Sequence, residues 1–72
     1  GVTALIQIPR AEVCMLNIRD VNGKLLESKN MGLNRGINSF DISSFDLGSG
    51  MYFLEIHAQS GNVKVERFVI TR

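Results

Sequence analysis

Cysteine, tryptophan and long hydrophobic runs are scarce or absent in this sequence. Cys14 is the single cysteine of the 72 residues, so no intramolecular disulfide can form and a zinc site built from cysteines is excluded. No apolar run approaches the ~20 residues that cross a bilayer, and the N-terminus lacks the layout of a signal peptide. We therefore expect a domain that folds by packing alone and does not insert into a membrane.

An excess of charge of one sign is also lacking. Eight Lys and Arg residues stand against seven Asp and Glu residues, which leaves a formal net charge of +1. The charges are scattered along the chain, so we expect neither nucleic acid nor anionic lipid as a partner. The apolar share of 44% is ordinary for a folded chain, and we treat residues 1–72 as one domain.

No set of residues suggests catalysis or metal binding. His57 is the sole histidine and is interpreted as a solvated strand residue. Cys14 alternates with apolar residues, which is typical of a buried small hydrophobic side chain. Asp20, Asp41 and Asp46 are too dispersed for a calcium loop and suit turns instead. We expect no catalytic residue, no metal and no cofactor, and hence no enzyme.

What the sequence does contain is β-strand pattern. Six short segments are interpreted as strands, most of them with alternating apolar residues, namely 2–8, 12–20, 24–30, 37–42, 51–59 and 63–70. Residues that favour turns separate them, and no window shows a convincing helical period. The pattern predicts an all-β antiparallel sandwich of six to seven strands.

The connections carry recognisable turn signals. Asn22-Gly23 lies between two apolar segments and predicts a type I′ hairpin, which needs residues with positive φ. Residues 60–62 predict a second hairpin. Residues 30–36 are interpreted as a polar connection.

The segment 51–56 is the most apolar strand and is predicted to lie at the centre of the fold, covered on one face and near its start on both. Gly48 and Gly50 punctuate the connection before it. We interpret Gly50 as a turn residue. Tyr52 is expected to bury its ring while its hydroxyl caps a loop.

Four features occur in a set order: Ile-Arg-Asp-Val-Asn-Gly-Lys at 18–24, Gly-Ile-Asn at 36–38 followed by Phe-Asp-Ile-Ser at 40–43, Ser-Gly-Met-Tyr-Phe at 49–53, and Lys-Val-Glu-Arg-Phe-Val-Ile at 64–70. Together they resemble the type A C-terminal sorting domain of the bacterial type IX (Por) secretion system. The residues that match the family motifs, and that we interpret as structural, are Asp20, Gly23, Gly36, Gly50 and Tyr52.

The resemblance implies an immunoglobulin-like β-sandwich at the end of a larger secreted protein. Such a domain is not catalytic: an outer-membrane translocon reads it, and a sortase-like protein at the cell surface processes or attaches the protein. The partners implied are these two components and an N-terminal cargo domain in the same precursor. The implied route is through the periplasm of a Gram-negative bacterium to the cell surface or the medium. The family's usual first strand is absent from residues 1–72.

The last strand supplies a hypothesis for how a partner binds. A strand at a sheet edge can be extended by a partner strand, and Lys64, Arg67 and Arg72 would place positive charge beside this edge. Alternation puts Lys64 and Arg67 on opposite faces, which argues against one shared patch. Exposed edges would also permit an edge-strand dimer or a strand swap.

Two other functions stay open from the sequence. An accessory carbohydrate-binding module would need exposed aromatic platforms, and the chain has no Trp and one Tyr. A structural or spacer sandwich of a surface or hook-cap protein would share the glycine and tyrosine pattern. Position within the precursor separates the spacer from the sorting domain, because a sorting domain lies at the extreme C-terminus.

Overall fold

The computed structural model describes residues 3–42 and 45–71. Their backbone forms strands and turns without an α-helix, which confirms the all-β prediction. The strands are β1 (Thr3–Ile8), β2 (Glu12–Arg19), β3 (Leu25–Leu33), β4 (Gly36–Asp41), β5 (Gly50–Ala58) and β6 (Val63–Ile70).

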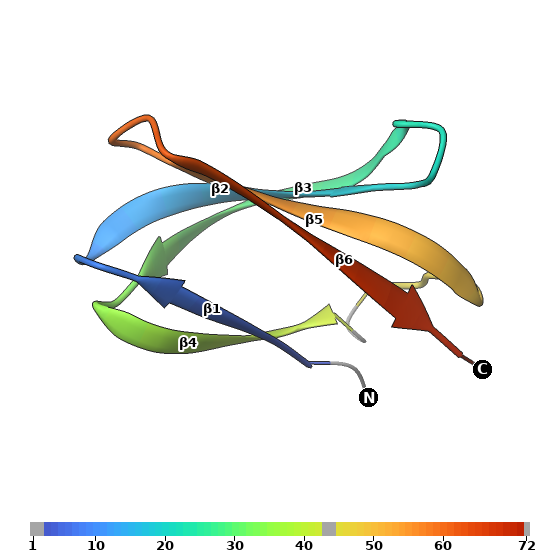
Figure 1. Cartoon of the computed structure of the whole chain (residues 1–72), viewed down its shortest axis with the longest axis horizontal. Helices are drawn as coiled ribbons and strands as arrows, with labels where there is room; N and C mark the ends of the chain where they lie inside the picture. Colours follow the sequence, from blue (N-terminus) through green and yellow to red (C-terminus); the bar gives the residue numbers. More distant parts are fainter. Residues whose placement is uncertain (1–2, 43–44, 72) are drawn as a thin grey trace.

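The strands form two antiparallel sheets. Among the described residues, one sheet is four-stranded in the order β3-β2-β5-β6, and the other is formed by β1 and β4. Figure 1 shows the small sheet lying across one face of the large sheet, which confirms the sandwich. β5 lies between β2 and β6, so the strand predicted at the centre of the fold is an interior strand of the larger sheet.

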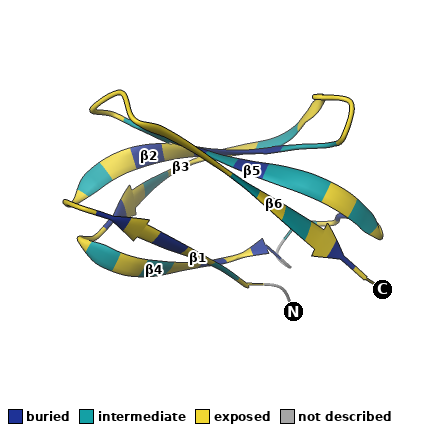
Figure 2. Ribbon diagram, viewed as in Figure 1, coloured by how far each residue is buried: buried dark blue, intermediate teal, exposed yellow. Residues whose placement is uncertain are grey.

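The core lies between the two sheets, because alternate side chains of each strand point inward. Figure 2 shows that strands of both layers contain buried positions. Cys14 is completely buried among them, as predicted. The buried hydrophobic residues are Ile6, Ile8, Cys14, Leu16, Ile18, Leu33, Phe40, Ile42, Leu47, Leu54, Ile56 and Ile70.

The outer face of β5 differs from the prediction. Met51, at the start of the strand, is 40% exposed, so the expectation that both faces are covered there is wrong. The second sheet covers only the inner face of the larger sheet. Apolar side chains exposed singly are common on folded proteins, and packing on one side is enough to hold this strand.

β3 is longer than predicted. It continues through Asn30 to Leu33 and pairs with β2 as far as Glu12, so residues 30–33 are strand rather than polar connection. Met31 lies opposite Cys14, and Leu33 is buried in the core. The burial of Leu33 and the partial burial of Met31 against the core outweigh the polar character of their neighbours.

The link from β3 to β4 is therefore very short. The side chain of Asn38 closes it: Asn34 N–H donates to Asn38 Oδ1 at 2.9 Å, and Asn38 Nδ2 donates to the Asn34 carbonyl at 2.8 Å. Gly36 begins β4 with φ 99°, a conformation that glycine adopts without strain.

The hairpin between β2 and β3 is present, but its turn is not type I′. Gly23 has φ 83°, whereas no non-glycine residue of the described ranges has positive φ. Gly23 N–H donates to the Asp20 carbonyl at 3.0 Å, and Asp20 N–H donates to the Lys24 carbonyl at 3.1 Å. This pattern is a type I turn followed by a glycine bulge.

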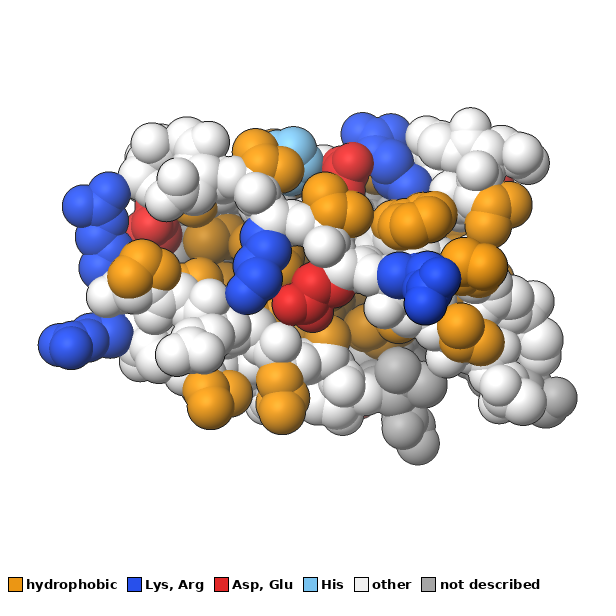
Figure 3. All heavy atoms as spheres, viewed as in Figure 1, with side chains coloured by type: hydrophobic (Ala, Val, Ile, Leu, Met, Phe, Trp, Pro, Cys, Tyr) orange, Lys and Arg blue, Asp and Glu red, His pale blue; other side chains and the backbone are white. Residues whose placement is uncertain are grey.

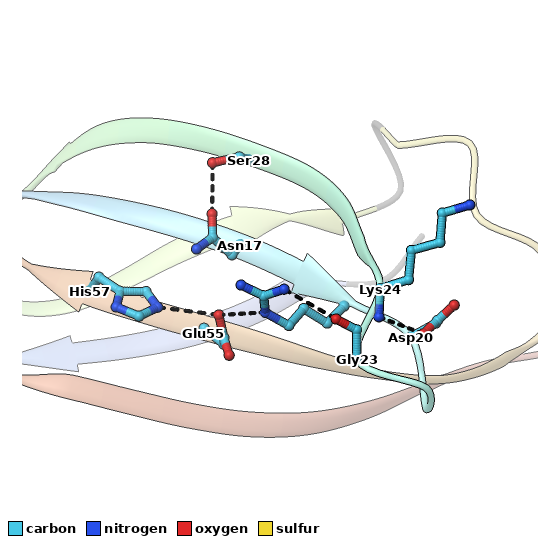
Figure 4. Close-up of polar contacts among 8 residues, drawn as sticks. Asn17, Asp20, Gly23, Lys24, Ser28, Glu55 and His57 are labelled. Atoms are coloured by element: carbon cyan, nitrogen blue, oxygen red, sulfur yellow. Dashed lines mark hydrogen bonds and ion pairs between the residues drawn. The ribbon is translucent and has the colours of Figure 1, made fainter.

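The physical reason lies in Asp20. One oxygen of its carboxylate accepts the Asn22 N–H at 2.9 Å and the Lys24 N–H at 3.0 Å. Figure 4 shows the bond from Lys24. These bonds hold the turn with Asn22 at negative φ and override the local preference of Asn-Gly. The hairpin after β5 repeats the backbone pattern, since Gly61 N–H donates to the Ala58 carbonyl at 2.9 Å.

Candidate functional site

The open side of β6 is the most regular sheet edge in the described part of the chain. Within residues 3–42 and 45–71, β6 pairs only with β5 (Figure 1). It has 8 residues, contains neither Pro nor Gly, and pairs with β5 without a register shift. We call this unpaired side of the strand the β6 edge. The last strand was predicted to lie at an edge, and it does.

The other edges are less suited to strand addition. β3 has 9 residues, but its pairing with β2 shifts register between Ile18 and Arg19, and its middle is polar. β1 and β4 have 6 residues each, and Pro9 follows β1. Bulges, charges, proline and short length all disfavour pairing at an edge.

The side chains of β6 alternate as predicted. Val63, Val65 and Val69 lie on the outer face and are 59%, 56% and 59% exposed. Lys64 pairs with Ile56 of the inner row, whereas Arg67 pairs with Phe53 of the outer row. The structure therefore does not bring Lys64 and Arg67 together into one basic patch.

Arg72, the third basic residue that the sequence singles out, lies outside the described residues.

The inner face of β6 changes from polar to apolar along the strand. Lys64 Nζ lies 3.9 Å from Glu66 Oε1, and their side chains are 53% and 38% exposed, so this ion pair is weak. Phe68 stacks on Tyr52 with ring centroids 5.6 Å apart, and Ile70 is buried. The strand is thus anchored through its C-terminal half, while its first half is open to solvent.

A cavity of about 280 Å³ lies beside that open half. Ile6 and Ile8 of β1 and Ile56 of β5 contribute apolar walls, and Lys64 of β6 also lines it. Figure 3 shows this side of the molecule, where hydrophobic side chains lie among basic and acidic ones. Sequence reasoning missed the cavity, because it depends on how far the small sheet extends over the large one.

A polar network crosses the outer face of the large sheet (Figure 4). Arg19 Nε donates to Glu55 Oε1 at 2.9 Å, and His57 Nε2 lies 3.2 Å from the same oxygen. The hydrogen bond from Arg19, followed by that from His57, holds the pKa of Glu55 below its usual value. His57 is half-exposed, as predicted, and has this structural contact.

A second polar contact lies alongside the network (Figure 4). Ser28 Oγ donates to Asn17 Oδ1 at 2.6 Å, and Asn17 is 7% exposed. Asn17 lies opposite Glu55 and Ser28 in neighbouring strands. The sequence alone could not show that Asn17, Ser28 and Glu55 lie opposite one another, because this depends on the register of three strands.

The five motif residues that we interpret as structural lie in turns or in the first residues of strands, and none of them belongs to β6. Tyr52 Oη donates to the Gly48 carbonyl at 2.7 Å, a contact that agrees with the expected loop cap. The ring also packs against Gly50, where a Cβ would lie 3.6 Å from Tyr52 Oη. Asp20 and Gly23 form the first hairpin, and Gly36 begins β4.

No metal or membrane feature is visible in the ranges 3–42 and 45–71. His, Cys, Asp and Glu do not form any group there that could hold a metal ion. Burial raises the pKa of the Cys14 thiol, which disfavours the reactive thiolate. Those ranges contain no helix of the length and hydrophobicity that a membrane span requires.

Comparison with protein families gives one informative match. Residues 2–71 match the model of the family described as the secretion system C-terminal sorting domain. No curated protein and no solved structure gives a match.

Proposed function

The chain belongs to the family of secretion system C-terminal sorting domains, and we propose that its β6 edge is the surface that the outer-membrane translocon of the type IX system recognises. Membership makes the chain a C-terminal signal for type IX secretion. It also implies a cargo on the N-terminal side of the same precursor and export to the cell surface or the medium. Domains of this family are generally not catalytic.

The observation that carries the proposal is the unpaired backbone of β6 in a regular strand. A partner strand can bind such an edge through main-chain hydrogen bonds, and these do not depend on the side chains of the signal. The anchoring of Phe68 and Ile70 holds the edge in an extended conformation. A partner therefore does not have to order a flexible segment when it binds.

Charge beside the edge would add to this recognition. We keep Lys64, Arg67 and Arg72 as the proposed partner-binding residues. Lys64 and Arg67 are exposed on opposite faces of β6, so each contacts a different face of an added strand. They would set the register and the rate of association rather than form one anion-binding site.

The later steps of export are also part of the proposal. The precursor crosses the periplasm of a Gram-negative bacterium, and a sortase-like protein then releases the cargo or attaches it to the cell surface.

Within the precursor, we propose that residues upstream of the chain supply the family's additional strand. Two observations support this placement: in the described part of the chain β1 pairs on one side with β4 and has no partner on its other side, and the cavity of about 280 Å³ is lined partly by β1.

A reporter fusion tests the proposal. The 72-residue chain is fused behind a signal peptide and a folded reporter in a bacterium that has the type IX pathway, and the reporter is then located. Export is expected, and a reporter retained in the periplasm refutes the sorting function.

Charge reversal tests the β6 edge within the same fusion. The variant Lys64→Glu, Arg67→Glu, Arg72→Glu is expected to reduce export. The matched control Lys24→Glu, Lys29→Glu, Arg35→Glu changes the net charge equally, away from β6, and is expected to be exported normally. Normal export of the β6 variant would show that these charges are not read.

A further inference from the structure

The charges at the centre of β6 disfavour pairing of this edge with a second copy. β6 covers residues 63–70, so two antiparallel copies overlap most when the two-fold axis passes through Glu66 or Arg67. The first register places Glu66 opposite Glu66 of the second copy, and the other places Arg67 opposite Arg67. Like charges directly opposite one another destabilise strand pairing.

The registers that avoid this repulsion are shorter. An axis through Val65 places Lys64 opposite Glu66 of the second copy, which is favourable, but then only residues 63–67 of each β6 lie opposite one another. Beyond them the second strand meets the turn at Gly61, which has φ 103° and donates its N–H to Ala58. That turn cannot continue the ladder.

We infer that the β6 edge favours an antiparallel strand of a different polypeptide over a second copy of this chain. This strand has an acidic residue opposite Arg67 and a basic residue opposite Glu66. The inference rests on the proposed function, because it specifies the partner that the same edge accepts. It gives the mixed charges of β6 two effects, which are to prevent self-pairing and to select the partner.

The remaining positions of β6 complete the partner's pattern. The exposed residues Val63, Val65 and Val69 favour β-branched apolar neighbours on the outer face. Phe68 and Ile70 on the inner face favour apolar residues, and Lys64, with a half-exposed side chain, favours an acidic one. The fitting strand, read from the residue opposite Ile70 to the residue opposite Val63, is Ile-Val-Phe-Glu-Lys-Val-Glu-Val.

Two synthetic peptides test this pattern on the 72-residue chain. The first has the fitting sequence, and the second, Ile-Val-Phe-Lys-Glu-Val-Glu-Val, has the same composition but exchanges the residues opposite Arg67 and Glu66. We expect the first to bind about tenfold more tightly, with shifts of the β6 amide signals in NMR spectra. The variant Glu66→Arg, Arg67→Glu should reverse the preference. Equal binding of the two peptides overturns the inference.

Measurements of self-association test the second part of the inference, that the charges of β6 prevent pairing with a second copy of the chain. Sedimentation should show the chain as a monomer, and Glu66→Thr, Arg67→Thr should strengthen dimerisation about tenfold or more. The matched variant Glu27→Thr, Lys29→Thr on β3 should remain monomeric, and circular dichroism verifies that each variant is folded. A wild-type dimer through β6, or a monomeric double β6 variant, overturns the inference.

The proposed function can survive this failure. If neither peptide binds while charge reversal on β6 still blocks reporter export, the edge is recognised in another way and only the partner pattern is wrong.

Discussion

Replacing Asp20 by alanine tests what holds the β2–β3 hairpin. The substitution removes the acceptor of the Asn22 and Lys24 amides, at 2.9 Å and 3.0 Å. Both bonds are exposed, so water takes their place and the loss is about 1–2 kcal/mol in total rather than the larger cost of buried bonds. A chain of this length is stabilised by roughly 4–11 kcal/mol, so the loss is a substantial fraction.

Urea unfolding followed by circular dichroism measures this loss. With a slope near 1 kcal/mol per M for a small domain, the midpoint of Asp20→Ala should fall by about 1–2 M. Asp20→Asn keeps an acceptor oxygen and should lose less than half as much. An alanine variant that unfolds at the wild-type urea concentration would refute our account of the turn.

The variants Asp20→Ala and Asp20→Asn also distinguish a structural role of Asp20 from its direct recognition by the export machinery. If Asp20 is structural, export of a fused reporter should fall only as far as the domain unfolds. An Asp20→Asn variant that is stable but not exported would show instead that the machinery reads the carboxylate.

Three further predictions concern the core and the outer face. Tyr52→Phe removes the bond to the Gly48 carbonyl and should lower the free energy of unfolding by about 0.5–1 kcal/mol in urea titrations. Leu54→Ala, at a buried position, should cost about 2–5 kcal/mol and leave much of the chain unfolded in thermal melts. Arg19 lowers the pKa of Glu55, so the folded state binds fewer protons than the unfolded state. The resulting stabilisation is present above the ordinary carboxyl pKa and disappears as the pH falls through the lowered value. Glu55→Gln should therefore reduce the acid sensitivity of the melting temperature.

Alternation in the sequence was sufficient to place most of the strands, because large apolar residues such as Leu16, Leu54 and Ile56 occupy the inward positions and are buried. It failed in β3, where Asn30 and Gly32 point to a loop but strand pairing with β2 and burial of Leu33 decide the structure. The Asn-Gly signal predicted the wrong turn type, because the side chain of Asp20, outside that pair, determines the backbone conformation of the turn. Local preferences are least reliable where a tertiary contact or a neighbouring side chain competes with them.

The candidate site was predicted only in part. The hypothesis placed the last strand at a sheet edge, where the structure has it, and alternation correctly separated Lys64 from Arg67. The contact between Arg19 and Glu55 depends on the register of strands 36 residues apart in sequence. The cavity beside Lys64 depends on the width of the small sheet. Neither the strand register nor the width of the small sheet can be read from the sequence of one strand.

Photo-crosslinking in cells that export the reporter tests the central claim most directly. A photoreactive residue replaces Val65 on the β6 edge, 56% exposed, or Ile37 on the small sheet, 71% exposed. We predict that the Val65 position crosslinks to an outer-membrane component of the type IX machinery and that the Ile37 position does not. Crosslinking from Ile37 without crosslinking from Val65 would contradict the account.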